Sequence, residues 1–152
     1  MAIRKTTVLF KFVAVCLIIS FLLPSFASAA VPETVQPMAS YYLEWYSAYI
    51  CTLSRGRFEV WYDVTATTYM DDLGVLSIRL YESTDNVNWT WLKTYLPENY
   101  SSMLVQDEIH YVSSVSFQGV VGRYYKAYVC IWAGKDGGGD SRYIWTPVEQ
   151  AV

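Results

Sequence analysis

Residues that commonly carry out catalysis are scarce in this chain. Its 152 residues include one histidine, His110, and three cysteines. Neither the Gly-x-Ser-x-Gly motif of a serine hydrolase nor the His-Glu-x-x-His motif of a zinc peptidase is present. A lone histidine without such a motif does not identify an active site. We therefore predict that the protein is not an enzyme and that it uses no cofactor and no metal.

A hydrophobic run long enough to cross a bilayer is also missing. The apolar segment 12–23 is shorter than the roughly 20 residues that a transmembrane helix needs. Arg4, Lys5 and Lys11 precede it, and the small residues Ala27-Ser28-Ala29 follow it. This order of features is typical of a secretory signal peptide. The sequence thus predicts cleavage near Ala29, contact with a membrane only through the signal peptide, and a secreted, extracellular mature protein.

Basic residues are few once the predicted signal peptide, residues 1–29, is removed. Eight basic side chains then remain against all fourteen acidic ones, a net charge of −6. No part of the sequence concentrates Lys and Arg into a basic patch. Because the phosphates of nucleic acid repel an acidic surface, we predict no nucleic-acid partner.

Alternation of apolar and polar residues dominates the mature chain. Residues 30–40 contain two prolines and lack this pattern, so we expect a spacer there and a single domain at residues 41–152. Period-two alternation predicts half-buried strands. The expected strands are 48–53, 58–65, 75–82, 89–95, 111–117, 125–133 and 142–147. About seven short strands favour an all-β fold, an antiparallel sandwich of the immunoglobulin-like or fibronectin-like kind.

Three connections between these strands differ in character. Ser83–Trp89 contains the Asp and Asn residues that favour a hairpin loop. Segment 135–140 has three consecutive glycines, which predict a second loop. Segment 96–109 is a long link with few apolar residues, and we expect it to cross between the sheets.

Acidic residues near two of the turns could attract calcium. Asp71 and Asp72 are adjacent, and Asp136 or Asp140 could approach them. Neither loop has the ligand spacing of a calcium-binding loop, so we expect solvated acidic loops and no metal site.

Two cysteines, Cys51 and Cys130, remain in the predicted mature chain. Export makes a disulfide between them chemically feasible. Cys130 falls in the outward register of its strand, so such a bridge would sit on an outer face of a sheet. The alternative is two unpaired, small apolar side chains. The sequence leaves both interpretations open.

The most informative set of side chains is an expected outer face. The residues predicted to point inward are Phe58, Val60, Leu76, Ile78, Tyr125, Val129 and Ile131. Two strands that usually pair in such a sandwich then present the outward residues Arg79, Tyr81, Tyr124, Lys126, Tyr128 and Trp132. Rings flanked by cations can hold a glycan or a protein ligand. They can also be cross-strand pairs that only stabilise an exposed sheet.

We therefore expect a non-enzymatic extracellular binding domain. A structural or self-assembling module, in which a second copy covers the same rings, is the alternative. A small secreted hydrolase comes third, because a pair of catalytic carboxylates needs no sequence motif. The sequence predicts neither the identity of the ligand nor the oligomeric state.

Three short motifs add a resemblance that spans roughly residues 47–146. They are Met70-Asp71-x-Leu73-Gly74, Glu82-Ser83-x-Asp85-Asn86-x-x-Trp89 and Gly119-x-x-Gly122-x-x-Tyr125-x-Ala127. In these positions the chain resembles a family of small secreted β-sandwich proteins of Clostridia-like Gram-positive bacteria, a family whose activity is not established. The resemblance implies export and a β-sandwich. Its motifs are turn and packing signatures, and none is catalytic.

Overall fold

The structure is a computed structural model that describes residues 40–152. The predicted signal peptide and nearly all of the predicted spacer lie outside these residues. Within the described part, no helix is long and apolar enough to span a membrane.

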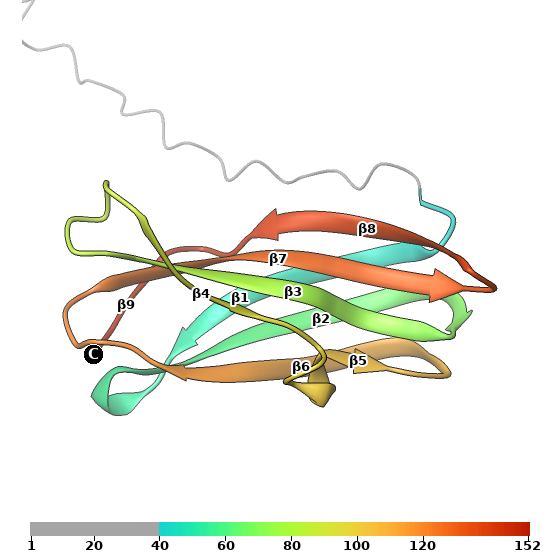
Figure 1. Ribbon diagram of the computed structural model, residues 1–152, viewed down its shortest axis with the longest axis horizontal. Helices are drawn as coiled ribbons and strands as arrows, with labels where there is room; N and C mark the ends of the chain where they lie inside the picture. The colour runs from blue at the N-terminus through green and yellow to red at the C-terminus, as the bar shows by residue number, and fades with distance from the viewer. Residues whose placement is uncertain (1–39) are drawn as a thin grey trace, which may run out of the picture. The chain divides into compact units, whose positions relative to one another are not determined.

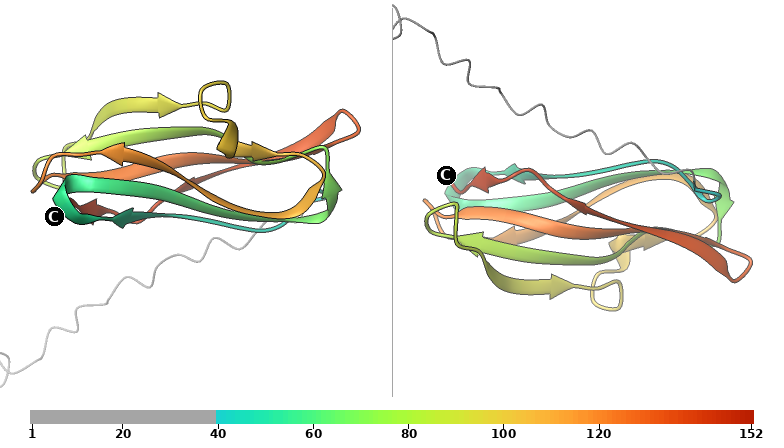
Figure 2. Two further views of the ribbon diagram at one scale, coloured as in Figure 1. Left: turned by 90° about the horizontal axis from the view of Figure 1, so that it is seen from below. Right: turned by 90° about the horizontal axis from the view of Figure 1, so that it is seen from above.

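Two antiparallel sheets make up the domain (Figures 1 and 2). The first contains β1 (Leu43–Thr52), β2 (Arg57–Met70) and β6 (Glu108–Gln118), in the order β1-β2-β6. The second contains β4 (Thr90–Tyr95), β3 (Asp72–Ser83), β7 (Tyr124–Lys135) and β8 (Gly138–Trp145), in the order β4-β3-β7-β8. Two short strands extend it, β5 (Leu104–Val105) on β3 and β9 (Glu149–Gln150) on β7. The seven longer strands confirm the predicted all-β sandwich of about seven strands.

The core lies between the two sheets and follows the predicted alternation. In β2, every second residue from Phe58 to Ala66 is at most 1% exposed, and in β7 the same holds from Tyr125 to Ala133. Phe58 joins the layers, because its ring centroid lies 4.9 Å from that of Phe117 and 4.8 Å from that of Tyr125. Burial of each Val, Ile or Phe side chain in this core stabilises the fold by about 1.5–3 kcal/mol.

The predicted inward position of Leu76 is wrong. The pairing of β3 with β7 shifts between Val75 and Ser77, which marks a β-bulge. Val75 and Ile78 are fully buried, whereas Leu76 is only half-buried. A bulge adds one residue to a strand and reverses the facing of the residues beyond it. The extra residue here keeps both halves of β3 facing the core.

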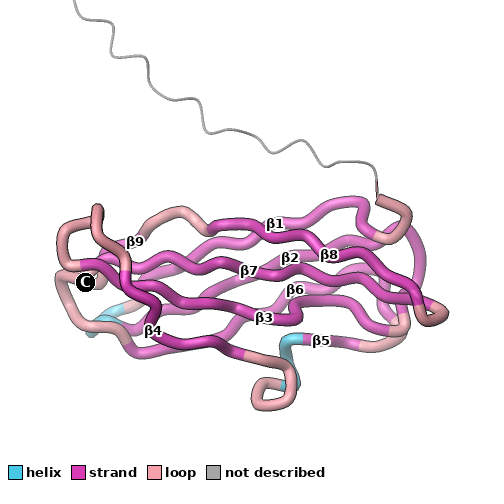
Figure 3. Tube along the Cα trace, turned by 45° about the horizontal axis from the view of Figure 1, so that its top comes forward, coloured by secondary structure: helices cyan, strands magenta, loops and turns pink. Residues whose placement is uncertain are grey.

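The predicted loop at residues 135–140 is shorter than expected. Strand β7 continues to Lys135 and β8 begins at Gly138, so only Asp136 and Gly137 form the turn (Figure 3). Their φ angles are 52° and 76°, which suits a two-residue hairpin turn. Three consecutive glycines predicted a loop, but the second and third are strand residues.

The two other predicted connections agree with the structure. Segment 96–109 leads from β4 in one sheet to β6 in the other, and includes a single 3₁₀ turn, η3 (Ser101–Met103), and β5. A second 3₁₀ turn, η2 (Ser54–Gly56), joins β1 to β2. Ser83–Trp89 connects β3 to β4 as a hairpin loop.

The carboxylate of Asp85 organises this hairpin loop. Its Oδ1 accepts hydrogen bonds from the backbone N–H of Asn88 at 2.8 Å and of Val87 at 2.9 Å. The side chain of Asn88 donates to Oδ2 at 2.6 Å, and the Ser83 hydroxyl donates to Oδ1 at 2.9 Å. These bonds, led by the one from the Asn88 backbone, hold the pKa of Asp85 well below its usual range.

Gly74 gives a first test of the packing of the sandwich. Its φ is 141°, and a Cβ there would overlap the carbonyl oxygen of Met103 in η3. We expect Gly74→Ala to lower the free energy of unfolding by about 3 kcal/mol, from strain together with overpacking. Gly137→Ala is the matched control, because its φ of 76° is also strained but no atom lies within 4 Å of the added Cβ. It should cost about 1 kcal/mol in urea unfolding. Equal unfolding midpoints for the two variants would contradict this packing.

The Asp85 loop gives a test of pH dependence. A carboxyl whose pKa is lower in the folded state stabilises the fold above its unfolded pKa, which is about 3.9. That stabilisation disappears as the pH falls from this value through the folded pKa. The difference in unfolding free energy between the wild type and Asp85→Ala should therefore be constant near neutral pH and shrink below about pH 4. Thr84→Ala, which alters the exposed neighbour, should show no such change, and an Asp85 difference that is as large at pH 2 as at neutral pH would refute the assignment.

Candidate ligand-binding face

The outward side of the six-stranded sheet gathers rings from four strands and a loop. In the β3–β7 ladder Arg79 lies opposite Tyr128 and Tyr81 opposite Lys126, which confirms that the two strands predicted to be neighbours are paired. The ladders to β4 and β8 extend this side, with Trp91 opposite Tyr81 and Trp145 opposite Tyr128. The name ring face is used for the set Arg79, Tyr81, Trp89, Trp91, Lys126, Tyr128, Tyr143 and Trp145.

Four of the six residues predicted for this face belong to it: Arg79, Tyr81, Lys126 and Tyr128. The other two lie at opposite ends of β7. Tyr124 is opposite Ser83 and Gln150, at the end where β9 pairs. Trp132 lies over Gly134 and Gly139, since a Cβ added to either glycine would come within 2.8 Å of its indole. These two residues face outward as predicted but stand apart from the ring contacts.

Trp145 is the centre of the ring face. Its ring centroid lies 4.6 Å from that of Tyr128, with 34° between the planes. It also lies 5.3 Å from the ring of Tyr81, which belongs to β3, two strands away in the sheet. Tyr128 in turn stacks on Tyr143, with centroids 5.3 Å apart and 22° between the planes. The indole therefore links three strands on the outside of the sheet.

Lys126 is held between two indoles. Its Nζ lies 4.1 Å from the ring centroid of Trp89 and 4.7 Å from that of Trp145. Such cation–π contacts contribute about 0.5–1 kcal/mol at exposed sites. Trp89 reaches the face from the end of the Asp85 loop, so that loop sets the position of one wall of the lysine site.

The charge of this face is opposite to that of the domain. Residues 40–152 carry eight basic and thirteen acidic side chains, a net charge of −5. On the ring face both charged residues, Arg79 and Lys126, are basic. The acidic residue on the outward side of this sheet is Asp72. It is the first residue of β3 and lies opposite Gly134, beyond Trp132. Glu82 points the other way, into an ion pair with Arg123 at 2.9 Å.

Three of the six rings on the ring face are at least half exposed. Trp91 is 57% exposed, Tyr143 54% and Trp145 50%. Large side chains exposed together on one side of a sheet often mark an interaction surface. The rings thus contact one another and still present their outer sides to solvent.

The two cysteines do not form a disulfide, and both are free. Cys51 is exposed on β1, whereas Cys130 is buried on β7 in the other sheet. Packed sheets lie about 10 Å apart, beyond the roughly 7 Å between Cα atoms that a disulfide spans. Of the two interpretations that the sequence left open, unpaired cysteines are the one that the structure supports. Cys130 lies beneath the ring face, opposite Tyr143, and its hydrogen bond and charge raise the pKa of the Tyr143 phenol.

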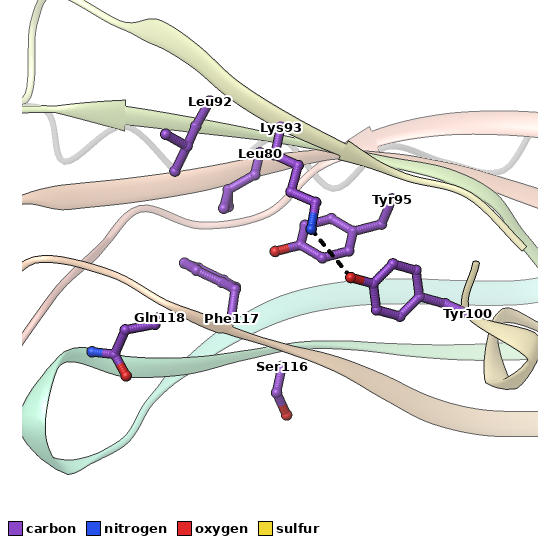
Figure 4. Close-up of a pocket in the computed structure, with 8 residues that line it drawn as sticks. All are labelled: Leu80, Leu92, Lys93, Tyr95, Tyr100, Ser116, Phe117 and Gln118. Carbon is purple, nitrogen blue, oxygen red and sulfur yellow. Dashed lines mark hydrogen bonds between the residues drawn. The ribbon is translucent and has the colours of Figure 1, made fainter.

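A pocket of about 460 Å³ lies on another side of the domain, between β4 and β6 (Figure 4). Lys93 stands at its rim, where Nζ donates to the Tyr100 hydroxyl at 3.2 Å and lies 4.6 Å from the ring centroid of Tyr95. Most of the apolar lining is already covered, because Leu80 is 1%, Tyr95 4% and Phe117 9% exposed, whereas Leu92 is 42% exposed. A ligand there would bury little additional apolar surface, so the ring face is the stronger candidate.

The acidic turns serve a structural role. The Asp71 carboxylate accepts a hydrogen bond from the backbone N–H of Asp136 at 2.7 Å, which joins the β2–β3 turn to the β7–β8 turn. Over residues 40–152, no group of three or more His, Cys, Asp or Glu side chains is placed to hold a metal ion.

Comparison with known proteins gave no match: no family model fits the sequence, and no curated protein or solved structure is significantly similar. The resemblance noted from the three sequence motifs therefore stays a prediction.

Four members of the ring face were not predicted from the sequence: Trp89, Trp91, Tyr143 and Trp145. Alternation would have identified the two on β8, because Tyr143 and Trp145 flank the half-buried Ile144. In β4 the same rule, counted from the buried Tyr95, would have placed Trp91 inward, because the pairing of β3 with β4 shifts between Leu80 and Tyr81. Trp89 lies in a loop, where alternation carries no information.

Trp145 should matter more for stability than an equally exposed tryptophan. We expect Trp145→Ala to lower the free energy of unfolding by about 1–2 kcal/mol, because it removes two ring pairs and a cation–π contact. Trp91→Ala removes an indole whose polar contact is a hydrogen bond to Thr94 at 3.2 Å, and should change stability by about 0.5 kcal/mol or less. Urea unfolding of both variants makes the comparison. Equal losses would show that Trp145 does not link the strands.

Proposed function

We propose that the protein is a secreted, non-enzymatic binding domain whose ligand is a glycan bound on the ring face. The observation that carries the proposal is the group of half-exposed rings around Arg79 and Lys126, a cationic surface on an acidic domain. Tyr and Trp combine an apolar body with a polar edge. A sugar ring has the matching chemistry, with C–H groups on its faces and hydroxyls around its edge.

The two cations favour a glycan that carries carboxylates. Arg79 can form paired hydrogen bonds with a carboxylate, and Lys126 acts as a point charge. A uronate-containing polymer therefore fits better than a neutral one. The contribution of exposed charges falls as salt is added, since the screening length is about 10 Å at 0.1 M.

A protein ligand is the second candidate, and the same residues support it. Trp, Tyr and Arg are the residue types that most often dominate the energy of protein interfaces. In that case the cations would face acidic groups of the partner.

Retention on insoluble polysaccharides tests the proposal. We expect the chain from Ala30 to be retained on cross-linked polygalacturonate more strongly than on cellulose, and less strongly at 0.5 M than at 0.05 M salt. Trp91→Ala/Tyr143→Ala should weaken retention about tenfold or more, because each lost ring contact is worth about 0.5–1.5 kcal/mol. Both rings are half-exposed and lie away from the central contacts of Trp145, so this variant should fold.

The control changes rings on the opposite side of the domain. Tyr49→Ala/Trp61→Ala alters the three-stranded sheet and should not weaken retention. Circular dichroism establishes that the variants are folded. If the wild type is not retained on any polysaccharide, or if both variants are retained equally, the glycan proposal is wrong.

A further inference from the structure

The outward side of the three-stranded sheet also carries exposed rings. We call it the back face, and define it by Trp45, Tyr49, Glu59, Trp61, Asp63, His110 and Val112. Tyr49 and Trp61 lie opposite each other in the β1–β2 ladder, with ring centroids 6.5 Å apart and planes within 6° of parallel. Trp45 is 48% exposed, and Tyr49 and Val112 are each 44% exposed. Within the described residues, none of the functions assigned above uses this surface.

Carboxylates at fixed positions stand on both sides of Trp61. Glu59 Oε2 accepts a hydrogen bond from the Trp61 indole N–H at 2.9 Å. Asp63 Oδ1 lies 2.8 Å from Nε2 of His110 on the neighbouring strand β6. The outward positions with basic residues on this sheet are His110, which is paired with Asp63, and Arg57, the first residue of β2. The middle of the back face is therefore acidic.

The ring face and the back face are complementary in charge and similar in composition. One has Arg79 and Lys126 among rings, and the other has Glu59 and Asp63 beside rings. We propose that the back face of one molecule docks on the ring face of a second copy of this chain. Two ring faces placed together would bring cations against cations, so the contact is front to back rather than two-fold.

A front-to-back contact leaves one face free on each end of the pair. Such a heterologous contact continues as an open chain unless its rotation closes a ring. The back face spans three strands about 4.8 Å apart and about eight residues at 3.3 Å each, on the order of 400 Å² per partner. Stable complexes bury about 800 Å² per partner. We therefore expect weak, concentration-dependent chains that dissociate at high salt.

This inference goes beyond the proposed function and does not require it, since the contact forms without glycan. The test is sedimentation velocity from about 10 µM to 1 mM, with no polysaccharide present. The weight-average mass of the wild type should rise through dimer and trimer without a plateau, and rise less in 0.5 M salt. A constant monomer mass would overturn the proposal, and so would a plateau at dimer.

Charge reversal identifies the two faces. Arg79→Glu/Lys126→Glu makes both faces acidic, and Glu59→Lys/Asp63→Lys makes both basic, so each protein alone should associate at least tenfold more weakly. An equimolar mixture pairs opposite faces at every contact and should restore chain growth. Failure of the mixture to associate, with both variants folded by circular dichroism, would overturn the docking geometry.

Polysaccharide retention separates this inference from the glycan proposal. Glu59→Lys/Asp63→Lys should be retained at least as well as the wild type while failing to assemble by itself. Wild-type assembly with no retention would reject the glycan and keep the self-docking. Retention with no wild-type assembly would keep the glycan proposal and reject the self-docking.

Discussion

The antiparallel pairing of β3 with β7 is the constraint on which both sides of the six-stranded sheet depend. Facing residues in this ladder alternate between the core, where Ile78 meets Val129, and the outside, where Arg79 meets Tyr128. A slip of one residue would exchange the two sides. The cost of exposing the buried side chains therefore keeps the charged and aromatic residues in place. The position of the ring face is set by the core behind it.

The bulge at Leu76 explains why one inward residue was not predicted. Strict alternation from Ile78 and Leu80 back along β3 places Leu76 in the core, but the observed pairing inserts a residue there. Such an insertion leaves no mark in a pattern of apolar residues, because Leu suits either position. The C-terminal half of β3 was predicted correctly since it lies beyond the irregularity. The outward placement of Arg79 and Tyr81 did not depend on the residue that was misplaced.

The presence of the strands and the pairing of β3 with β7 could thus be predicted from the sequence. Side-chain contacts that reach across several strands could not. Alternation says that a residue faces outward, but not how far its side chain reaches. The Trp145 indole extends from β8 to Tyr81 on β3, and Trp89 reaches Lys126 from a loop. The cysteines show the same limit, because spacing alone did not tell that Cys51 and Cys130 belong to different sheets.

Mutual packing of the rings does not compete with a binding role. A ring that is held by its neighbours loses less rotamer freedom when a ligand arrives, which lowers the entropic cost of association. Tyr128 is such a ring, since Tyr143 stacks on it and Trp145 packs against it at a tilt. The cross-strand pairs that stabilise the sheet would therefore also pre-order a binding surface. The two interpretations of the outer face that the sequence left open describe one arrangement.

The two proposals also constrain each other. The glycan and the back face of a second copy would both approach Arg79 and Lys126, so one molecule cannot hold both on its ring face. Binding to one excludes the other, and the coupling is reciprocal by thermodynamic necessity. Glycan at saturating concentration would shorten the chains of protein molecules. A high protein concentration would in turn weaken the retention of the protein on polysaccharide. The terminal molecule of each chain keeps a free ring face, so even a long assembly would retain one glycan site at one end.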